Sequence, residues 1–443
     1  MLMERRSKHL FLLVGSNPLP VFVAASLLSE PQGTIYFIHT IDTYYYAKQL
    51  SALLTKSSGY LPAQFRFFEL TSPADQFKIH QDLAKHLSNA KFSAGETVGF
   101  NYTGGMKSMS VHAYEFFKEW CQKKYLRFTF SYLDPLESCL RFANGESYSP
   151  SGQDCSLTLC ELLALHGRKI TDQEPKAFFP AVSTLLANIA AESSGVFNMK
   201  AWNNKFLKGI TKQQFEAYLR NFYSPEGFEQ SRLFPSFEAL ENFLCKSFQN
   251  TSLAVSDNTF LTSGNNQLPS VPVLGQLALA FVDTEKPDIS RWTLDSLSDR
   301  LVKYLDGGWL ENYVLSCLEA ISDQCGIHER ILNFHFNKPA ATVDPPEFDV
   351  AAMQGYRLFA FSCTVSAEKE KAKLKLFEAY VRARQIGGDE AKVALVSGYP
   401  QPQKLFEEIS EAWMESRNKI KIFGPQHLPN LETHLKDWFL ANE

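Results

Sequence analysis

Two stretches of the 443-residue chain combine residue types that could bind phosphate. Gly15-Ser16-Asn17-Pro18 and Thr103-Gly104-Gly105-Met106-Lys107-Ser108 each follow an apolar run of strand length and precede a segment with helical spacing. A helix N-terminus offers free amides and positive partial charge to an anion, and glycine lets the backbone approach it closely. The predicted ligand-binding residues are Gly15, Ser16, Asn17, Pro18, Thr103, Gly104, Gly105, Met106, Lys107 and Ser108.

The position of these two turns decides between a ligand crevice and ordinary helix caps. Gly, Ser, Thr and Asn are common at any strand-to-helix turn, so a single such turn is explained as a cap. If the strand order is 3-2-1-4, however, the two turns face each other where the winding of the sheet reverses, and such sheets bind ligands there. A dinucleotide-binding enzyme would need GxGxxG after the first strand, and residues 15–20 lack it.

A second group of residues is of the types that hold a catalytic metal ion. Glu311 follows Gly307-Gly308 near the start of a predicted helix, and Glu347 and Asp349 lie two residues apart in a predicted strand, which places them on one face. Carboxylates bind Mg²⁺ or Mn²⁺, and such an ion polarises a phosphate and lowers the pKa of the attacking water. We predict Glu311 and Asp349 as metal ligands. The candidate catalytic residues are Glu311, Glu347, Asp349, Ser362 and Thr364.

Each of these acids also has a structural explanation. Glu311 could serve the helix dipole, and Glu347 and Asp349 could be charges on an edge strand. Asp349 lies between Phe348 and Val350 in an otherwise apolar strand, where an unpaired buried carboxylate is costly. One lysine of the next helix could reach the site, although alternating charges usually form a solvated face. These lysines are Lys369, Lys371, Lys373 and Lys375.

The elements that must position the first group follow from the alternation of patterns in residues 1–150. Five apolar runs of strand length alternate with four segments of helical spacing, which predicts an α/β domain with a doubly wound, Rossmann-like parallel sheet covered on both faces. A further short strand is predicted over 138–143. The apolar runs are His9–Gly15, Gly33–Thr40, Gln64–Leu70, Glu96–Thr103 and Tyr125–Leu133, and the helical segments are Leu19–Leu28, Thr43–Lys56, Pro73–Lys91 and Met106–Lys124.

The rest of the chain divides into two parts. Residues 151–294 carry helical patterns broken by Pro, Gly and Asn, and predict a helical connecting region, with a small winged-helix unit as one interpretation. Residues 295–443 predict helix, three strands, helix, strand and a further helix, which is a C-terminal α/β domain. Its strands are predicted over 330–336, 347–353, 357–365 and 392–397, and its helices over 295–305, from 309, over 367–386 and over 404–416.

The first group of residues resembles the motifs of a known family. Asn101 to Lys107, opening a helix after the fourth strand, resembles the ligand motif of the CRISPR-associated Rossmann-fold (CARF) sensors, and Gly15 to Pro18 stands where those sensors carry their other motif. The resemblance implies a homodimer that binds a cyclic oligoadenylate, foremost cyclic tetra-adenylate, across its two-fold axis. It also implies a role in type III CRISPR antiviral defence.

The C-terminal part resembles the nuclease domain of CARF-domain nucleases. This implies a restriction-endonuclease-like domain of the PD-(D/E)xK type over 295–443, with a divalent metal ion. The family's second strand ends in Glu-x-Lys, whereas Ser362 and Thr364 occupy those positions here, which predicts a divergent and weakened site. The matching stretches are Leu163–Gly167, Gly307–Glu311, Glu347–Val350 and Ile386–Gly388.

Composition limits which cellular environment and which partners we expect for the protein. A net charge of -4 means that any contact with nucleic acid must come from a local patch. The apolar runs are too short for a membrane span or a signal peptide, so we expect a cytoplasmic protein whose eight cysteines are buried thiols. Cys317, Cys325 and His328 hint at a zinc site, but no fourth ligand is evident.

Three hypotheses about function remain open at this point. The first is a cyclic-oligoadenylate-activated, metal-dependent nuclease acting on DNA or RNA. The second is a pseudonuclease, in which the ligand switches the dimer but the C-terminal domain only binds nucleic acid or a partner. The third is a ring nuclease, in which the crevice cleaves its own activator with Ser16, Lys107 or Ser108.

Overall fold

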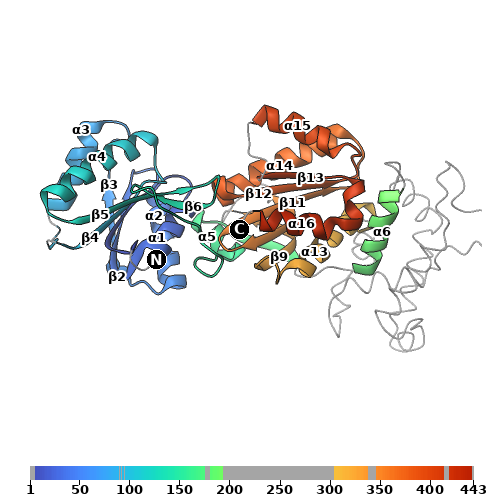
Figure 1. The fold of residues 1–443 in the computed structure, drawn as a ribbon, viewed down its shortest axis with the longest axis horizontal. Helices are drawn as coiled ribbons and strands as arrows, with labels where there is room; N and C mark the ends of the chain where they lie inside the picture. The colour runs from blue at the N-terminus through green and yellow to red at the C-terminus, as the bar shows by residue number, and fades with distance from the viewer. Residues whose placement is uncertain are drawn as a thin grey trace, which may run out of the picture.

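The computed structural model of the chain shows two α/β domains side by side (Figure 1). It describes residues 5–88, 90, 92–93, 95–174, 180–192, 304–337, 346–413 and 419–441. Most of the predicted helical connecting region, the winged-helix interpretation and most of the helix predicted over 295–305 lie outside the described residues. Within the described part, no helix has both the length and the apolar character that a membrane crossing needs.

The N-terminal domain is built on a seven-stranded sheet with the order β3-β2-β1-β4-β5-β6-β7. Strands β1 to β5 pair in parallel, and β6 and β7 continue the sheet antiparallel. The winding reverses between β1 and β4, as the order 3-2-1-4 requires. The strands are β1 (Ser7–Leu13), β2 (Ser29–His39), β3 (Phe65–Glu69), β4 (Thr97–Asn101), β5 (Arg127–Asp134), β6 (Cys139–Phe142) and β7 (Ser147–Tyr148).

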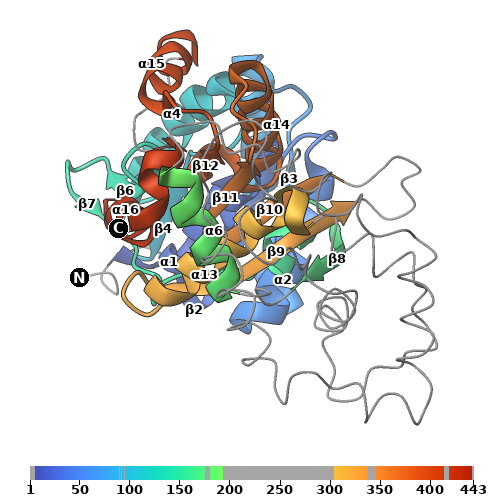
Figure 2. The same cartoon turned by 90° about the vertical axis from the view of Figure 1, so that its right-hand side faces the viewer.

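Helices cover both faces of this sheet, which confirms the predicted doubly wound fold (Figures 1 and 2). Leu10 and Leu12 of β1 pack with α1 and α2, whereas Phe11 and Leu13, on the opposite face, pack with α3 and α4. Nine of the ten residues of α1 are buried, because this helix is apolar all round and is covered all round. The helices are α1 (Leu19–Leu28), α2 (Tyr44–Ser58), α3 (Gln76–Ser88) and α4 (Lys107–Lys123), with a short turn η2 (Pro62–Gln64).

The C-terminal domain has a six-stranded sheet with the order β13-β12-β11-β10-β9-β8. Strands β8 to β11 are antiparallel, and β11, β12 and β13 are parallel. The edge strand β8 comes from residues that the sequence analysis assigns to the connecting region, and β13 is not among the predicted strands. The strands are β8 (Lys169–Glu174), β9 (Ile327–Asn337), β10 (Glu347–Gln354), β11 (Arg357–Thr364), β12 (Lys392–Ser397) and β13 (Ile420–Phe423).

Helices again cover both faces of the second sheet. The apolar residues of α14 and α15 belong to the same cluster as Leu358 and Ala360, whereas α6, α13 and α16 share a cluster with Phe359 and Phe361. The predicted order of helix, three strands, helix and strand is present as α13, β9 to β11, α14 and β12. The helices are α6 (Pro180–Glu192), α13 (Trp309–Ile321), α14 (Lys369–Gly387), α15 (Pro402–Trp413) and α16 (Leu431–Leu440), with short turns η4 (Tyr304–Gly308), η5 (Gly388–Glu390) and η6 (Pro425–Asn430).

The two domains share one apolar core. A single cluster of buried side chains runs from α1 of the first domain through α5 (Leu159–Leu165) to α14 of the second. The β10–β11 hairpin turn adds two hydrogen bonds to this contact. The Tyr356 hydroxyl donates to the Ser138 carbonyl at 3.4 Å, and the Leu157 amide donates to the Gly355 carbonyl at 3.1 Å. Gly355 has a φ of +60°, which glycine adopts without strain. The domains are therefore packed against each other and not merely linked.

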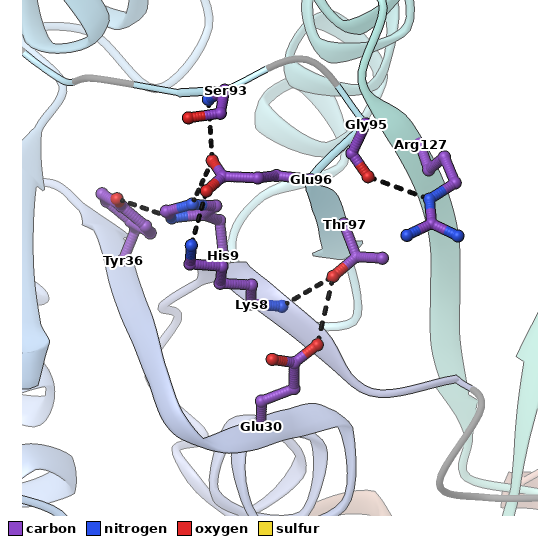
Figure 3. Close-up of polar contacts among 9 residues, drawn as sticks. All are labelled: Lys8, His9, Glu30, Tyr36, Ser93, Gly95, Glu96, Thr97 and Arg127. Carbon is purple, nitrogen blue, oxygen red and sulfur yellow. Dashed lines mark hydrogen bonds and ion pairs between the residues drawn. The ribbon is translucent and has the colours of Figure 1, made fainter.

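A polar network lies at the amino ends of β1 and β4, away from the loops that leave their carboxyl ends (Figure 3). Glu96 accepts from Lys8 at 2.5 Å and from the Ser93 amide at 2.8 Å, and its carboxylate lies 3.1 Å from Nε2 of His9. These donors lower the pKa of Glu96 to about 2, while burial lowers the pKa of His9. The network therefore depends on an ionised Glu96.

This network predicts a specific loss of stability in acid. The pKa of Glu96 is lowered on folding, so its contribution is complete above about pH 4.5 and disappears as the pH falls toward 2. We expect Glu96→Gln to lower the melting temperature at neutral pH and to leave little difference from the wild type near pH 2, as measured by thermal scans over this range. Glu119→Gln, which breaks the exposed pair with Lys123, should change little at any pH. A pH-independent deficit in Glu96→Gln would contradict this account.

Candidate ligand crevice and nuclease site

The two predicted turns meet at the carboxyl ends of β1 and β4. The strands are parallel neighbours, with Leu12 of β1 opposite Asn101 of β4. A Cβ atom on Gly15 would lie 2.8 Å from the Gly105 amide nitrogen, and one on Gly104 would collide with the Leu13 carbonyl oxygen. Gly105 has a φ of +76°. The loops therefore face each other and touch, as the sequence analysis expects, and only glycine permits this distance.

A buried side chain that the prediction omitted holds the second loop in place. Asn101 is 1% exposed, donates to the Ser131 hydroxyl at 3.1 Å, and accepts from the hydroxyl of Thr103 at 2.8 Å. The Thr103 hydroxyl in turn accepts from the Leu133 amide at 2.7 Å. Thr103, predicted as a ligand donor, thus supports the loop from within. The signal that could have found Asn101 is a polar residue ending an apolar strand.

Some of the remaining predicted ligand residues are exposed, and another forms a hydrogen bond within the protein. Ser16, Met106 and Lys107 are exposed at the loops. The Ser108 hydroxyl donates to the Pro73 carbonyl at 2.7 Å and thereby ties α4 to the loop before α3. Neither α1 nor α4 has an acidic residue in its first turn, and no side chain caps α4 at Met106. The first-turn amides of α4 and the helix dipoles leave this edge suited to an anion.

Asn17 of the first loop points to the other domain. Its carboxamide oxygen accepts from the Leu19 amide at 3.2 Å, and its Nδ2 atom donates to Glu390 at 3.5 Å. Pro18 beside it is buried at the start of α1. The predicted ligand loop is therefore also an interdomain contact, which no pattern within residues 1–150 indicates.

The C-terminal site is centred on Asp349 of β10. This residue is 7% exposed, and its Oδ2 atom accepts from the Ser362 hydroxyl at 3.0 Å and from the Cys363 amide at 2.6 Å. Ser362 lies on the face of β11 that α14 covers, since its neighbours Phe361 and Cys363 belong to the cluster on the opposite face. Both donors come from the adjacent strand. Ser362 thus orients the carboxylate that the sequence analysis places at the site.

Glu347 and Thr364 have other partners than Asp349. The Glu347 carboxylate lies 3.7 Å from Nε2 of His335, and the Thr364 hydroxyl accepts from the Ser366 amide at 3.3 Å. The alternation of β10 is interrupted, because Phe348 and Val350 belong to different apolar clusters.

The partner strand β9 shows the cause of this interruption. Its Asn333 has a φ of +49°, and it stands between Phe334 and Leu332, which pair with Phe348 and Val350. Leu332 and Phe334 likewise belong to different apolar clusters, whereas the pairing of β9 with β10 keeps its register across this point. Spacing by two therefore does not by itself place Glu347 beside Asp349.

One lysine of α14 does reach the site. The Nζ atom of Lys375 lies 3.8 Å from Oδ2 of Asp349. Two others, Lys369 and Lys373, pair with Glu408 of α15, and Lys371 pairs with Glu368 on its own helix. Three of the alternating lysines thus form ion pairs with nearby glutamates, whereas Lys375 places its positive charge beside Asp349. Sequence alone could not choose among the four.

Glu311 and Cys363 complete the surroundings. Burial raises the pKa of the Cys363 thiol well above its ordinary value, the negative charges of Asp349 and Glu311 raise it further, and the positive charge of Lys375 opposes them. The charges of Asp349, Glu311 and Lys375 therefore all act near the end of β11. Cys363 is inert as a nucleophile under these conditions, because a protonated thiol is a poor one.

The donor set bears on a metal ion in two ways. Among the described residues no group of three or more His, Cys, Asp or Glu is arranged to hold a metal. Cys317 and Cys325 are buried thiols, and Nε2 of His328 lies 3.0 Å from the Leu157 carbonyl, so these residues do not support the zinc hint. Mg²⁺, however, is commonly held by one or two carboxylates with phosphate and water as the other ligands, and Asp349 and Glu311 are two carboxylates whose charges both act on the Cys363 thiol.

Fold and sites together define a class: a doubly wound, Rossmann-like domain packed on a second α/β domain with a carboxylate–lysine site on its sheet. Residues 298–442 match the family model described as "Card1-like, endonuclease domain". The match covers the C-terminal domain from α13 onward and confirms the resemblance that Gly307–Glu311 and Glu347–Val350 indicate. No curated protein sequence matches the chain significantly.

Solved structures share the fold along the whole chain. Protein VC1899 from Vibrio cholerae is 19% identical, with a TM-score of 0.57, and the match covers 98% of this chain and 99% of that one. Can2 from Sulfobacillus thermosulfidooxidans, solved in complex with cyclic tetra-adenylate, is 17% identical, with a TM-score of 0.56 and coverage of 98% and 97%. These likenesses confirm the predicted architecture of two α/β domains.

The contact between the two loops predicts a marked effect of one methyl group. Gly104→Ala places a Cβ atom against the Leu13 carbonyl, so we expect it to lower the free energy of unfolding by about 1–3 kcal/mol, measured by urea titration. Gly152→Ala is the matched control, because its Cβ atom would lie 3.6 Å from Gly355 in ordinary contact. Equal stability of the two variants would show that the loops are not in contact.

Proposed function

We propose that this protein is a cyclic-oligoadenylate sensor, with cyclic tetra-adenylate as its ligand, that controls a metal-dependent nuclease in type III CRISPR defence. One observation carries the proposal: two glycine loops meet at the switch point of the sheet, in a chain that shares its fold with a protein solved with cyclic tetra-adenylate. The endonuclease-domain match supports the second half of the proposal.

The two loops supply the groups that a phosphodiester ring needs. The uncapped first turn of α4 offers amides to phosphate, the Lys107 side chain adds a positive charge beside it, and Ser16 lies exposed on the opposite loop. Because Gly104 and Gly105 carry no side chain, the ligand can approach the backbone itself. This placement supports ligand-contact roles for Ser16, Met106 and Lys107.

The symmetry of the ligand and the surface beside the two loops support a homodimer. Phe77 at the start of α3 is 77% exposed, and Met106 and Val111 at the start of α4 are 55% and 54% exposed. Gln76 and Glu115, joined by a hydrogen bond at 3.4 Å, hold the two helices together there. Pairing of these exposed apolar residues with those of a second copy would let a two-fold axis pass through the ring, so that each protomer binds half of it.

The nuclease site is proposed around Asp349 and Glu311, which would hold Mg²⁺ or Mn²⁺. When bound, the metal ion polarises the scissile phosphate and makes its bound water a stronger nucleophile. Ser362 fixes the orientation of the Asp349 carboxylate through its hydrogen bond. Lys375 offers the positive charge that attracts the phosphate of DNA or RNA, in the place of the strand lysine that Thr364 replaces. The chain thus keeps negative and positive charges for this site, but its positive charge comes from a helix and not from the strand.

A pseudonuclease is the second candidate, and one observation favours it. Oδ2 of Asp349 is already engaged by Ser362, the Cys363 amide and Lys375, which leaves fewer lone pairs for a cation. Ring-nuclease chemistry through Ser108 has less support, because that hydroxyl donates to the Pro73 carbonyl.

The decisive experiment measures binding and cutting separately. Full-length protein is titrated with cyclic tetra-adenylate by calorimetry, and is then incubated with Mn²⁺ or Mg²⁺ and plasmid, single-stranded DNA or RNA, with and without that ligand. We expect submicromolar binding and ligand-dependent cutting. Binding without cutting would select the pseudonuclease, shortened ligand recovered after incubation would select the ring nuclease, and absence of binding would overturn the sensor.

Asp349→Asn tests the assigned metal site in the same assay. The carboxamide oxygen still accepts from Ser362 and the Cys363 amide, so the fold is kept while the negative charge is lost. We expect cutting to fall below detection with cyclic tetra-adenylate binding unchanged. Retained cutting would show that the active site lies elsewhere in the protein.

The lysine at the site makes a separate prediction. Lys375→Met removes the charge beside Asp349 while keeping the apolar stem, and we expect it to slow cutting by about a hundredfold or more. Lys371→Met on the same helix is the control, because Lys371 pairs with Glu368 at the surface. Initial rates of plasmid cutting compare the two. Equal rates would remove Lys375 from the mechanism.

A further inference from the structure

One helix of the C-terminal domain touches both candidate sites. The carboxyl end of α14 runs into Gly388 and Glu390, which lie against Asn17 of the ligand loop, and its amino-terminal half places Lys375 at Asp349. We propose that Glu390 is a positioning residue that couples the ligand loop to the nuclease site through α14. This proposal rests on the proposed function, and it assigns how the ligand would control that site.

The contact at Asn17 is close and specific. The Asn17 Nδ2 atom donates to Glu390 while its oxygen caps α1 at Leu19, so both ends of the carboxamide are used. Gly388 has a φ of +62°, and any Cβ atom there would collide with the Asn17 carboxamide. Movement of the loop on ligand binding must therefore displace either this turn or the hydrogen bond.

Glu390 is unusual as the acceptor. It is 1% exposed, and burial raises the pKa of its carboxyl to about 7, against the opposing effects of the Asn17 hydrogen bond and the charges of Lys392 and Lys419. A buried carboxyl is costly unless its partners compensate. A backbone hydrogen bond at Glu390 also favours the ionised carboxyl, and Asn17 is the side chain that donates a hydrogen bond to it, so withdrawal of Asn17 removes that donor from a buried group.

The surrounding contacts let the turn transmit a displacement. The His166 side chain lies near the backbone of Ile386, in the last turn of α14, and a Cβ atom on Gly387 would lie 3.2 Å from the Leu358 side chain. The helix end is therefore held between α5 of the first domain and β11 of the second. A packed end of this kind shifts as a unit, because interiors have little free volume.

The amino-terminal half of α14 carries this shift to the proposed nuclease site. Twelve residues separate Lys375 from Gly387, which is about 18 Å along a helix. Lys375 lies 3.8 Å from Asp349, just beyond a direct hydrogen bond, so a small displacement of α14 changes the charge that the carboxylate experiences. Thermodynamic linkage then requires that the same contact also alters ligand affinity.

An exchange of donor and acceptor tests the proposal. Asn17→Asp keeps the oxygen that caps α1 but replaces the donor to Glu390 with a second acidic group. Glu390→Gln keeps volume and an acceptor for Asn17. The double variant restores a hydrogen bond with donor and acceptor reversed. Full-length proteins are compared by the Kd for cyclic tetra-adenylate, by the ratio of cutting rates with and without it, and by melting temperature without ligand.

The expected pattern is non-additive. We expect Asn17→Asp to reduce the ligand-stimulated rate ratio about tenfold, Glu390→Gln to change it by less than about threefold, and the double variant to recover most of the loss. The melting temperature, which needs no ligand, should follow the same order.

Failure of this inference is distinguishable from failure of the proposed function. A double variant no better than Asn17→Asp overturns the coupling, since a direct effect of the added charge on the ligand would not be rescued. A wild-type protein that binds no cyclic tetra-adenylate overturns the proposed function and this inference with it. If Asn17→Asp does not fold alone, a folded double variant still shows the rescue, and an unfolded double variant counts against it.

Discussion

The close approach of two backbones, at Gly15 and Gly105, is the constraint on which the rest of the structure depends. Parallel neighbours β1 and β4 end side by side, so their loops compete for one volume. Side chains there would push the loops apart and would also push Asn17 away from the second domain. The same lack of side chains exposes the first turn of α4. The close contact of the two loops and the contact between domains therefore have one physical origin.

The C-terminal site shows how a charge pattern can persist when its sequence motif does not. Ser362 and Thr364 occupy positions where charged residues would be expected from the family resemblance, yet Asp349 still has a cation beside it, supplied by a helix that packs across the same face of the sheet. Position in space decides electrostatic effects, because Coulomb energy depends on distance and not on chain order.

Much of the fold could be predicted from the sequence, since β1 to β5 and α1 to α4 carry strong apolar periodicity. The facing loops followed from the strand order. Polar detail could not be predicted: the hydroxyls of Thr103 and Ser108 turn toward the protein, and nothing local marks Asn333 as the residue that interrupts β9. The Asn17–Glu390 contact joins residues 373 positions apart, beyond the reach of any local pattern.

Strand β8 has a consequence for how the second domain can be isolated. Its six residues, KITDQE, include one apolar side chain, which suits a sheet edge and explains why periodicity did not reveal it. Because β8 pairs with β9 while lying far upstream of it, the sheet includes residues outside the stretch that matches the endonuclease-domain family. A fragment beginning near residue 298 would expose the unpaired backbone of β9. Such an edge can pair with the strands of other molecules and cause precipitation.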